Sequence, residues 1–245
     1  MFKIRTMNTI SPLGTQILEK HGCEVGSQVE NPDALLIRSA DLHSTEFWPE
    51  LLCIGRAGAG TNNIPVEKCA EAGIVVFNAP GANADATKEM IIFDMLLASR
   101  DMLGAIEWVN SIADKGDDVP ALVEKGKSAF SGPELCGKSL GVIGLGAIGS
   151  LVANLALEFG MTVRGYDPYI SIESAWRLSR NVIHVDYVEE IFRTCDYISL
   201  NVPYNEGTHH MINAAALASM RPGVRIMNES RAEVVDDDAM IDALE

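Results

Sequence analysis

The chain has 245 residues, of which 47% are hydrophobic, so it can form one large α/β domain or two smaller ones. Its formal net charge of -15 argues against binding to a nucleic-acid backbone and leaves anionic small molecules to be held by local arginines. The longest apolar helical stretch, residues 90–98, is interrupted by Asp94 and is too short to cross a membrane. Five scattered cysteines without a CxxC pair predict buried thiols in a reducing cytosol, and His209-His210 has no third partner that would make a metal site.

The first third of the chain predicts alternating strands and helices. We expect strands at residues 3–7, 34–38, 52–56 and 74–77, with helices at residues 15–21, 45–51 and 66–72. Repeated βα units with short links predict a parallel sheet that is covered on both faces. Pro80-Gly81-Ala82-Asn83 marks a break, so residues 1–83 are predicted to form a first domain.

Residues 84–245 predict a second domain. It opens with one long apolar helix over residues 85–108 and continues through a polar connector at residues 115–120. The alternation then resumes, with strands expected at residues 139–143, 161–166, 182–185, 197–202 and 224–227, and helices at 151–159, 187–194, 213–220 and 236–244. The fold class expected is therefore α/β, with two doubly wound parallel-sheet domains. Because the chain stops at Ala243-Leu244-Glu245 inside a predicted helix, we expect the second domain to be incomplete.

The segment Gly144-Leu145-Gly146-Ala147-Ile148-Gly149 lies between a predicted strand and a predicted helix. A second strand follows the helix and ends at Asp167, which is the layout of a dinucleotide-binding βαβ unit. The glycines permit a tight turn and a close approach of the pyrophosphate to the helix N-terminus. A carboxylate at residue 167 favours NAD over NADP, because it accepts bonds from the ribose hydroxyls and repels a 2′-phosphate. The alternatives are a structural glycine loop and an acid that merely ends a strand before Pro168.

Three arginines end or follow predicted strands at the sheet edge where such folds bind ligands. Arg231 follows a strand of the second domain, and its planar guanidinium suits a carboxylate. Arg38 and Arg56 each end a strand of the first domain, and Arg56 opens a glycine-rich loop that can present N–H groups to an anion. The alternatives are a surface pair of Arg231 with Asp236 or Asp237, and ordinary strand-end charge for the other two.

With these motifs together, the chain resembles the NAD-dependent D-2-hydroxyacid dehydrogenases over its whole length. The motifs that carry the resemblance are Ile37-Arg38-Ser39, Gly55 to Gly60 with Asn63-Ile64, Asn78 to Asn83, Gly144 to Gly149 with Asp167-Pro168, Val202-Pro203, and Asn228 with Arg231. The resemblance implies a flavodoxin-like substrate-binding domain, residues 1–83, and a Rossmann NAD-binding domain, residues 84–245. It is strongest to the branch that oxidises D-3-phosphoglycerate to 3-phosphohydroxypyruvate in serine biosynthesis.

The resemblance also implies roles for individual residues. Arg231 matches the catalytic arginine that binds the substrate carboxylate and polarises the C2 oxygen. The substrate-binding positions are Arg38, Ser39, Arg56, Ala57 and Gly58. The cofactor-binding positions are Ala59, Gly144, Gly146, Ala147, Ile148, Gly149, Asp167, Val202, Pro203, Glu229, Ser230 and Arg231. The cofactor expected is NAD, and the partners expected are a small anionic substrate and further copies of the chain, as a homodimer or a higher homo-oligomer in the cytoplasm.

The sequence also departs from the family pattern. Glu229 and Ala232 flank the Ser230-Arg231 pair where the family has a small or apolar residue and a glycine, and we expect Glu229 to weaken NAD binding. The family's acid–base glutamate and histidine match no residue of this chain, so we expect residues 1–245 alone to turn over little substrate. Two other functions stay open: dehydrogenation of another D-2-hydroxy acid, and a non-catalytic NAD-sensing role like that of the family's corepressor branch.

Overall fold

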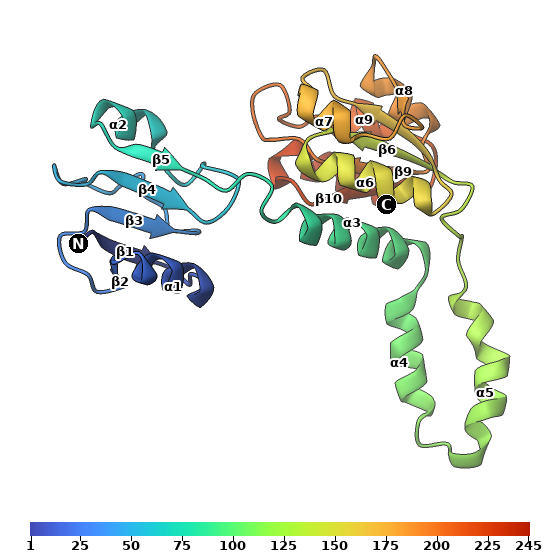
Figure 1. Ribbon diagram of the computed structural model, residues 1–245. Helices are drawn as coiled ribbons and strands as arrows, with labels where there is room; N and C mark the ends of the chain where they lie inside the picture. Colours follow the sequence, from blue (N-terminus) through green and yellow to red (C-terminus); the bar gives the residue numbers. More distant parts are fainter. The chain divides into compact units, whose positions relative to one another are not determined.

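The computed structural model describes residues 1–245 and divides into two compact units, Met1–Asn83 and Ala84–Glu245 (Figure 1). Each unit contains one parallel sheet of five strands, with helices packed against it. The predicted α/β class with two parallel-sheet domains is confirmed.

Unit 1 (Met1–Asn83) has the strand order β2-β1-β3-β4-β5, which is the flavodoxin-like order. Buried apolar residues of β3 and β4, among them Leu35, Ile37 and Ile54, pack with Cys69 and Ile74 to form its core. The β3–β4 register pairs Ile37 with Arg56, so the loops that follow these two strands start side by side. The elements are β1 (Lys3–Met7), α1 (Pro12–Lys20), β2 (Glu24–Gly26), β3 (Ala34–Ile37), β4 (Cys53–Arg56), α2 (Val66–Glu71) and β5 (Val75–Phe77).

The helix predicted at residues 45–51 is absent, and this segment is an irregular connection. Pro49 explains the error, because proline lacks an N–H donor and disfavours the helical conformation of the residue before it. Phe47 and Trp48 instead pack against the core of unit 1, and the Trp48 indole N–H donates to the carbonyl oxygen of Pro32 at 2.9 Å. The short strand β2 was not predicted.

Unit 2 (Ala84–Glu245) has the strand order β10-β9-β6-β7-β8, with every pair parallel. This is the Rossmann order, in which β6 is the central strand and the strand sequence reverses between β6 and β9. Ligands of open α/β sheets bind at that reversal, beyond the carboxyl ends of the strands. The strands are β6 (Ser139–Ile143), β7 (Thr162–Tyr166), β8 (Ile183–His184), β9 (Tyr197–Leu200) and β10 (Arg225–Asn228).

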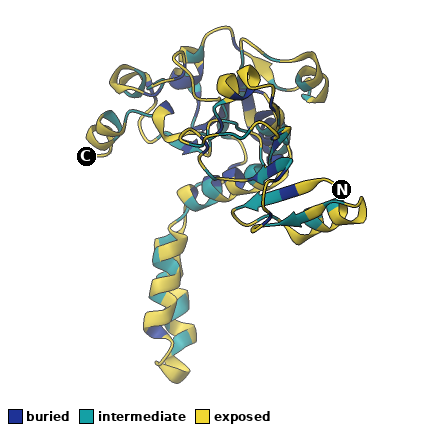
Figure 2. Cartoon of the chain, turned by 90° about the vertical axis from the view of Figure 1, so that its left-hand side faces the viewer, coloured by how far each residue is buried: buried dark blue, intermediate teal, exposed yellow.

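Two hydrophobic clusters cover the sheet of unit 2, and its strands are the most buried part of the unit (Figure 2). On one side α3 and α6 lie side by side and bury Ile91, Met95 and Val152 (Figure 1). The second cluster includes Ile191 of α8 and Ile198 of β9. The helices of this sheet domain are α3 (Ala84–Ser99), α6 (Ala147–Glu158), α7 (Ile172–Arg177), α8 (Val188–Thr194), α9 (Ala214–Ser219) and α10 (Asp237–Leu244), with one 3₁₀ turn, η3 (Ala232–Val234).

The single long helix predicted over residues 85–108 is two helices, because the chain breaks between α3 and α4 (Met102–Ile112). Asp101 caps the second helix by accepting the Gly104 N–H at 2.9 Å, and Arg225 closes the first by donating to the Ala98 carbonyl oxygen at 2.7 Å. None of the helices combines the length and the apolar character needed to cross a bilayer.

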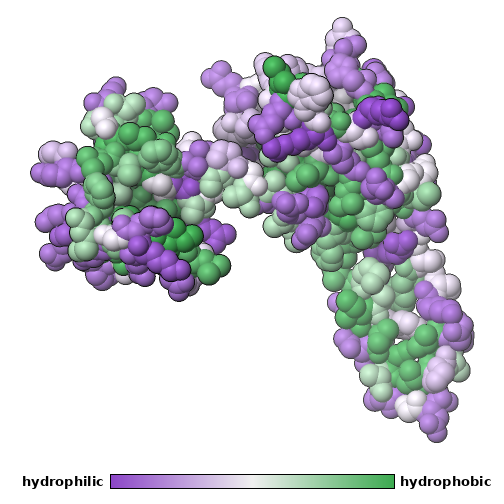
Figure 3. Space-filling view, in the orientation of Figure 1, coloured by the Kyte–Doolittle hydropathy of each residue, from purple (hydrophilic) through white to green (hydrophobic).

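Residues 102–130 form a helical arm that extends from the sheet domain of unit 2 (Figure 1). It consists of α4, η1 (Gly116–Asp118), α5 (Val119–Gly126) and η2 (Lys127–Phe130). The rings of Trp108 and Phe130 lie 5.2 Å apart and join its two halves. Figure 3 shows apolar residues on the surface of this arm. The exposed apolar side chains of α4 are Met102, Leu103, Ile106 and Val109.

All five cysteines are free thiols, but only Cys69 and Cys195 are buried. Cys23 and Cys53 are half-buried, and Cys136 is exposed, so the prediction of uniformly buried thiols was wrong. Cys136 follows the buried Leu135 in the connection that leads into β6, and such connections run over the protein surface.

Candidate functional site

The glycine turn after β6 and the start of α6 contain two glycines at positions that a side chain could not share. Gly144 has φ +89°, and a Cβ there would lie 2.6 Å from the carbonyl oxygen of Asn201. A Cβ on Gly149 would overlap the carbonyl oxygen of Gly144. Around Gly146, by contrast, no atom lies within 4 Å of the Cβ position, so its backbone faces open space. The turn therefore has no room for side chains where it packs on the sheet, and it has free space at Gly146, where a ligand would approach.

Helix α6 begins at Ala147, directly after the turn, and continues through Ile148. No side chain caps its first N–H groups, because Gly146 occupies the cap position. Uncapped N–H groups at the positive end of a helix attract an anion such as a pyrophosphate. The backbone here therefore fits the phosphate groups of a dinucleotide.

Asp167 stands at the end of β7, and both of its carboxylate oxygens already accept a backbone N–H. Oδ2 accepts from Leu145 at 2.8 Å, and Oδ1 accepts from Tyr169 at 2.9 Å. Each oxygen retains a lone pair, so the carboxylate can still receive ribose hydroxyls. The bond to Leu145 shows a second task that the sequence did not suggest, since Asp167 also holds the glycine turn in place.

A cavity of about 670 Å³ lies beyond the carboxyl ends of β6, β7 and β9. This volume lies in the usual range for small-molecule sites, roughly 300–1,000 Å³. The predicted cofactor residues that line it are Gly144, Gly146, Asp167, Val202 and Pro203. The cavity, the open glycine turn and the carboxylate together fit a bound dinucleotide.

Asn205 and Thr208 are among the residues that line this cavity without having been predicted from the sequence. Asn205 Oδ1 accepts the N–H groups of Gly207 and Thr208, at 2.9 and 3.2 Å. Thr208 Oγ1 donates to the carbonyl oxygen of Pro203 at 2.7 Å. This turn shapes one wall of the cavity, and the pattern Asn-x-Gly-Thr at residues 205–208, one residue after Val202-Pro203, was the signal that could have revealed it.

The His209-His210 pair lies in the same connection, between that turn and α9. The two rings stack with their centroids 3.9 Å apart, and Tyr204 meets His209 edge-on at 5.9 Å. His210 Nδ1 lies 3.8 Å from Asp236 Oδ2. The pair therefore forms part of an aromatic stack next to the cavity wall.

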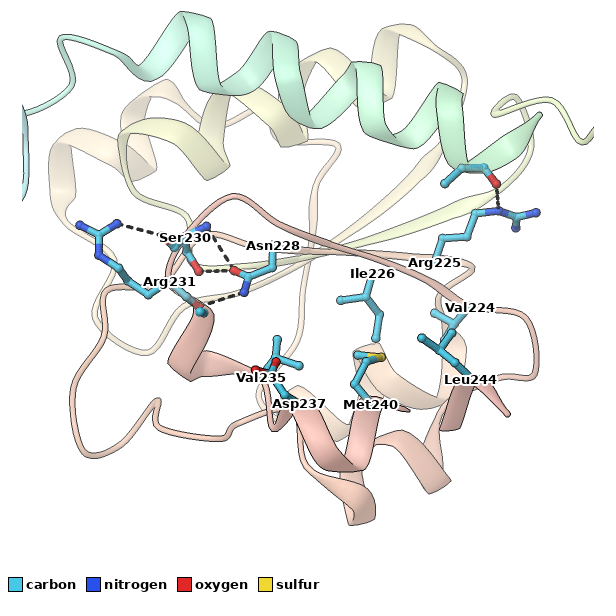
Figure 4. A pocket seen from close by; sticks show the side chains of 12 residues that line it. Val224, Arg225, Ile226, Asn228, Ser230, Arg231, Val235, Asp237, Met240 and Leu244 are labelled. Carbon is cyan, nitrogen blue, oxygen red and sulfur yellow. Dashed lines mark hydrogen bonds between the residues drawn. The ribbon is translucent and has the colours of Figure 1, made fainter. Parts of the chain in front are cut away.

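Arg231 and Ser230 lie after β10 and line a second cavity, of about 630 Å³ (Figure 4). Asn228 organises this turn, since its Oδ1 accepts from Ser230 Oγ at 2.6 Å and its Nδ2 donates to the Arg231 carbonyl oxygen at 2.9 Å. Arg231 lies at the opposite end of the cavity from Val224 and Leu244 (Figure 4).

The Arg231 guanidinium is exposed, and Nη1 donates to the carbonyl oxygen of its neighbour Ser230 at 2.9 Å. It makes no ion pair with Asp236 or Asp237, which was the alternative considered for it. Asp236 instead caps α10 by accepting the Ala239 N–H at 3.2 Å. The remaining guanidinium donors are available to an anionic ligand.

Glu229 shares a hydrogen bond with the side chain of Asp94 on α3. Loss of hydration around the Glu229 carboxyl group raises its pKa, and the hydrogen bond and the repulsion from Asp94 raise it further. Two neighbouring carboxyl groups favour a shared proton, because both cannot ionise without repulsion. The glutamate that departs from the expected pattern is thus partnered with a second acid rather than with a cation.

In unit 1 the predicted substrate residues occupy two adjacent loops. Arg38 and Ser39 follow β3, while Arg56, Ala57 and Gly58 follow β4. Arg56 Nε donates to the Arg38 carbonyl oxygen at 3.0 Å, and the Ala57 N–H donates to that of Ile37 at 2.7 Å. The structure therefore brings these five predicted residues together.

Ala59 lies in the second of these loops, and its carbonyl oxygen accepts from Asn78 Nδ2 at 2.7 Å. The Arg38 side chain is exposed and forms no ion pair. Two exposed loops that carry a free guanidinium and several backbone N–H groups can bind an anion.

Comparisons with known proteins agree with this geometry. Residues 92–245 match the family model described as D-isomer specific 2-hydroxyacid dehydrogenase, NAD binding domain. The chain is 37% identical over 224 residues to the D-3-phosphoglycerate dehydrogenase of Methanocaldococcus jannaschii, covering 90% of this chain and 40% of the relative. It thus spans about two-fifths of the length of this enzyme and of the D-3-phosphoglycerate dehydrogenase of Mycobacterium bovis.

Shorter relatives are covered more fully. The chain is 34% identical over 255 residues to the hydroxypyruvate reductase of Thermotoga maritima, covering 98% of this chain and 77% of the relative. Among solved structures, it is similar to the D-lactate dehydrogenase from Aquifex aeolicus complexed with NAD and lactic acid. That similarity has a TM-score of 0.74 and 27% identity, over 99% of this chain and 73% of the other.

Proposed function

Because the chain belongs to the D-isomer-specific 2-hydroxyacid dehydrogenase family and carries its NAD-binding domain, we propose that it oxidises D-3-phosphoglycerate to 3-phosphohydroxypyruvate. The observation that carries the choice of substrate is the pair of loops in unit 1, where Arg38 and Arg56 lie together. A substrate with both a carboxylate and a phosphate needs more cationic donors than lactate or glycerate does. The similarity to phosphoglycerate dehydrogenases supports the same choice.

The proposed roles divide the residues by the charges that they meet. The turn Gly144–Gly149 and α6 bind the pyrophosphate of NAD, and Asp167 binds the hydroxyls of its adenosine ribose. NAD, when bound, would accept the hydride that leaves C2 of the substrate. The hydroxyl proton would pass to the acid–base pair of the family, which matches no residue of this chain, so we expect residues 1–245 alone to show only slow residual turnover. In unit 2, Arg231 is proposed to bind a substrate carboxylate and to polarise the C2 oxygen. In unit 1, the loops with Arg38, Ser39 and Arg56 to Gly58 are proposed to bind an anionic group of the substrate.

A panel of hydroxy acids tests this proposal. Binding of 3-phosphoglycerate, glycerate and lactate is measured by titration calorimetry in the presence of NAD, and NADH formation is followed on the same panel. We expect 3-phosphoglycerate to bind tightest, and Arg38→Ala to remove that preference without changing the affinity for NAD. Equal binding of all three acids by the unchanged protein would contradict the phosphorylated substrate.

The second candidate is the same reaction on another D-2-hydroxy acid. It is favoured by the similarity to the hydroxypyruvate reductase, of which this chain covers the larger share. The same panel separates the two candidates, because glycerate would then equal or exceed 3-phosphoglycerate.

The proposed assembly is a homodimer or a higher homo-oligomer. Its support is the arm of residues 102–130, where Leu103 and Ile106 are more than half exposed. Exposed apolar side chains gathered on one element favour contact with another protein surface. Light scattering measures the mass of the unchanged protein and of the Leu103→Ser, Ile106→Ser double variant, with Leu13→Ser as control, since Leu13 is an exposed leucine on α1 of unit 1. A lower mass for the arm variant alone is expected, and an unchanged mass would contradict this interface.

A further inference from the structure

The loop after β3 is held by side chains from two other segments of unit 1. Asn8, which directly follows β1, accepts the N–H of Ser39 at 3.0 Å and that of Ala40 at 2.7 Å, both through Oδ1. No other side chain takes these two donors. A single amide oxygen therefore fixes the backbone at the residue next to Arg38.

Asn63 binds the same loop at its backbone carbonyl oxygens. Its Nδ2 donates to the carbonyl oxygens of Ala40 at 2.7 Å and of Arg38 at 3.3 Å. Its own carbonyl oxygen accepts the Leu42 N–H at 2.9 Å. Asn8 and Asn63 thus bind the N–H groups of Ser39, Ala40 and Leu42 and the carbonyl oxygens of Arg38 and Ala40.

The orientation of the Asn63 side chain follows from these contacts. Both amide hydrogens are engaged by carbonyl oxygens, so turning the amide over would place its oxygen against two other oxygens. In the observed orientation the Asn63 Oδ1 is buried and has no hydrogen-bond partner. An orphaned buried acceptor is unfavourable, and such groups in folded proteins concentrate where function requires the arrangement.

Arg56 contributes a third contact to the loop. Its Nε donates to the Arg38 carbonyl oxygen at 3.0 Å, and its guanidinium lies so close to Gly58 that a Cβ there would overlap it. Because the Arg56 side chain is bound along one edge, its Nη groups keep a defined direction. The Arg56 guanidinium is therefore fixed relative to the backbone of Arg38.

Asn8 also has an unusual backbone conformation, with φ +66°. Asparagine tolerates the left-handed region better than other residues with a side chain, and glycine tolerates it best. Glycine at position 8 would thus permit the conformation but would lack the acceptor for Ser39 and Ala40. Asparagine therefore does two things at this position. It adopts the left-handed conformation, which glycine could also do, and it accepts the N–H groups of Ser39 and Ala40, which glycine could not.

We propose that Asn8 and Asn63 are positioning residues for substrate binding, which hold residues 38–42 so that Arg38 and Ser39 meet the anionic group of the substrate in a fixed geometry. This inference rests on the proposed function of these loops. Neither asparagine touches the substrate in this account, since each acts on the backbone of residues that do. A displacement of about 1 Å in such a group can lower its effect by roughly a hundredfold.

The test uses Asn8→Gly, which preserves the positive φ and removes only the acceptor. Its matched control is Asn31→Gly, because Asn31 also lies in unit 1 with a positive φ of 46° and its side chain forms no hydrogen bond. Binding of 3-phosphoglycerate and of NAD is measured separately by calorimetry. We expect Asn8→Gly to lower the affinity for 3-phosphoglycerate by about ten- to a hundredfold and the affinity for NAD by less than about twofold. Asn31→Gly should change neither affinity.

A second variant tests whether the two asparagines act on one loop. Asn63→Ala is expected to lower the affinity for 3-phosphoglycerate in the same way. Its control is Asn62→Ala, because Asn62 is the exposed neighbour of Asn63. The double variant Asn8→Gly, Asn63→Ala should lose less than the product of the two single effects, because either change alone already frees the loop. Amide hydrogen exchange gives a readout without ligand, and Ser39 and Ala40 should exchange faster in Asn8→Gly while the β1 amides do not change.

The outcomes separate this inference from the function on which it rests. If the unchanged protein binds no 2-hydroxy acid, the proposed function fails, and the substrate role of Asn8 and Asn63 fails with it. If the unchanged protein binds 3-phosphoglycerate and Asn8→Gly binds it equally well, only the positioning role is overturned. A parallel loss of substrate affinity, NAD affinity and melting temperature would also overturn it, because a general loss of folding would then explain the result.

Discussion

The two sheets of this molecule both place their candidate ligand-binding loops at the carboxyl ends of parallel strands, but they shape these loops differently. In unit 2 the turn Gly144–Gly149 is made chiefly by the backbone, through glycines that permit close packing and a helix end without a cap, and Asp167 is the one side chain bound to it. In unit 1 the loop at residues 38–42 is shaped by side chains, chiefly those of Asn8 and Asn63. The same fold class can therefore shape an anion-binding loop in two ways: with glycines that leave the backbone accessible, or with asparagine side chains that bind the loop.

The largest effect is expected at Arg231, whose positive charge is proposed to stabilise the reacting oxygen of the substrate. Arg231→Gln should lower kcat/KM by about 100- to 1,000-fold, because the developing charge on the substrate oxygen loses its cation. Steady-state kinetics measure this, with NAD affinity expected to stay constant. Arg225→Gln is the control, since Arg225 lines the same cavity but bonds the Ala98 carbonyl oxygen and should affect mainly stability. A loss of turnover in Arg225→Gln without one in Arg231→Gln would reverse the assignment.

The backbone-built turn can be broken in two distinct ways. Gly149→Ala introduces a Cβ that overlaps the Gly144 carbonyl oxygen, and it should lower the stability of unit 2 by about 1–3 kcal/mol. The Cβ that Gly146→Ala introduces has no atom within 4 Å, so this variant should leave the melting temperature unchanged and lower only the affinity for NAD. Calorimetric melting and NAD titration on both variants measure the difference. Identical behaviour of the two variants would mean that the turn is not open toward a ligand.

Asp167 is the one side chain on which the backbone-built turn depends. Asp167→Ala should weaken NAD by about tenfold or more, because a charged acceptor is lost, and should reduce the preference over NADP. Asp167→Asn retains one oxygen for the N–H of Leu145 or Tyr169, so it should melt closer to the unchanged protein while still losing the cofactor preference. Titrations with NAD and NADP decide this, and an unchanged preference in both variants would refute the ribose assignment.

The smallest effect concerns Glu229 and its dependence on pH. Its pKa is raised in the folded protein, so the stability linked to its proton is complete below the ordinary value of 4.5 and is lost as pH rises through the higher folded value. Glu229→Gln removes this loss and should stabilise unit 2 above that range by less than about 1 kcal/mol, since the group is exposed and screened. Melting temperatures from pH 4 to pH 8 measure it. A variant that is less stable than the unchanged protein at pH 8 would contradict the repulsion from Asp94.

The same difference between the loops explains what the sequence could reveal. The glycine turn follows a spacing of three glycines with one acid at the end of the next strand, and its residues are neighbours in the chain. Asn8, Asn63 and residue 39 are distant in sequence, so nothing local indicates that they meet. The register of β1, β3 and β4 brings them together, and register depends on tertiary packing.

The errors in the predicted elements have local causes of another kind. Apolar periodicity at residues 45–51 suggested a helix, but Pro49 and the packing of Trp48 prevented it. Periodicity continued past residue 99 in the same way, although the side chain of Asp101 starts a new helix there. In both places a single residue that removes or supplies one backbone hydrogen bond outweighed the apolar pattern.

The break before Asp101 also has a consequence for dissecting the molecule. Gly132 lies against the carbonyl oxygen of Ser99, so the chain leaves the sheet domain and returns to it at nearly the same point. Residues 100–131 are thus an insertion whose two ends meet, and a short glycine-containing bridge can replace them without stretching α3 or β6. Without residues 100–131 the protein would keep both sheets and the cavity beyond β6, β7 and β9, and it would lack the exposed apolar side chains of the arm. A titration with NAD would then show whether cofactor affinity depends on the arm.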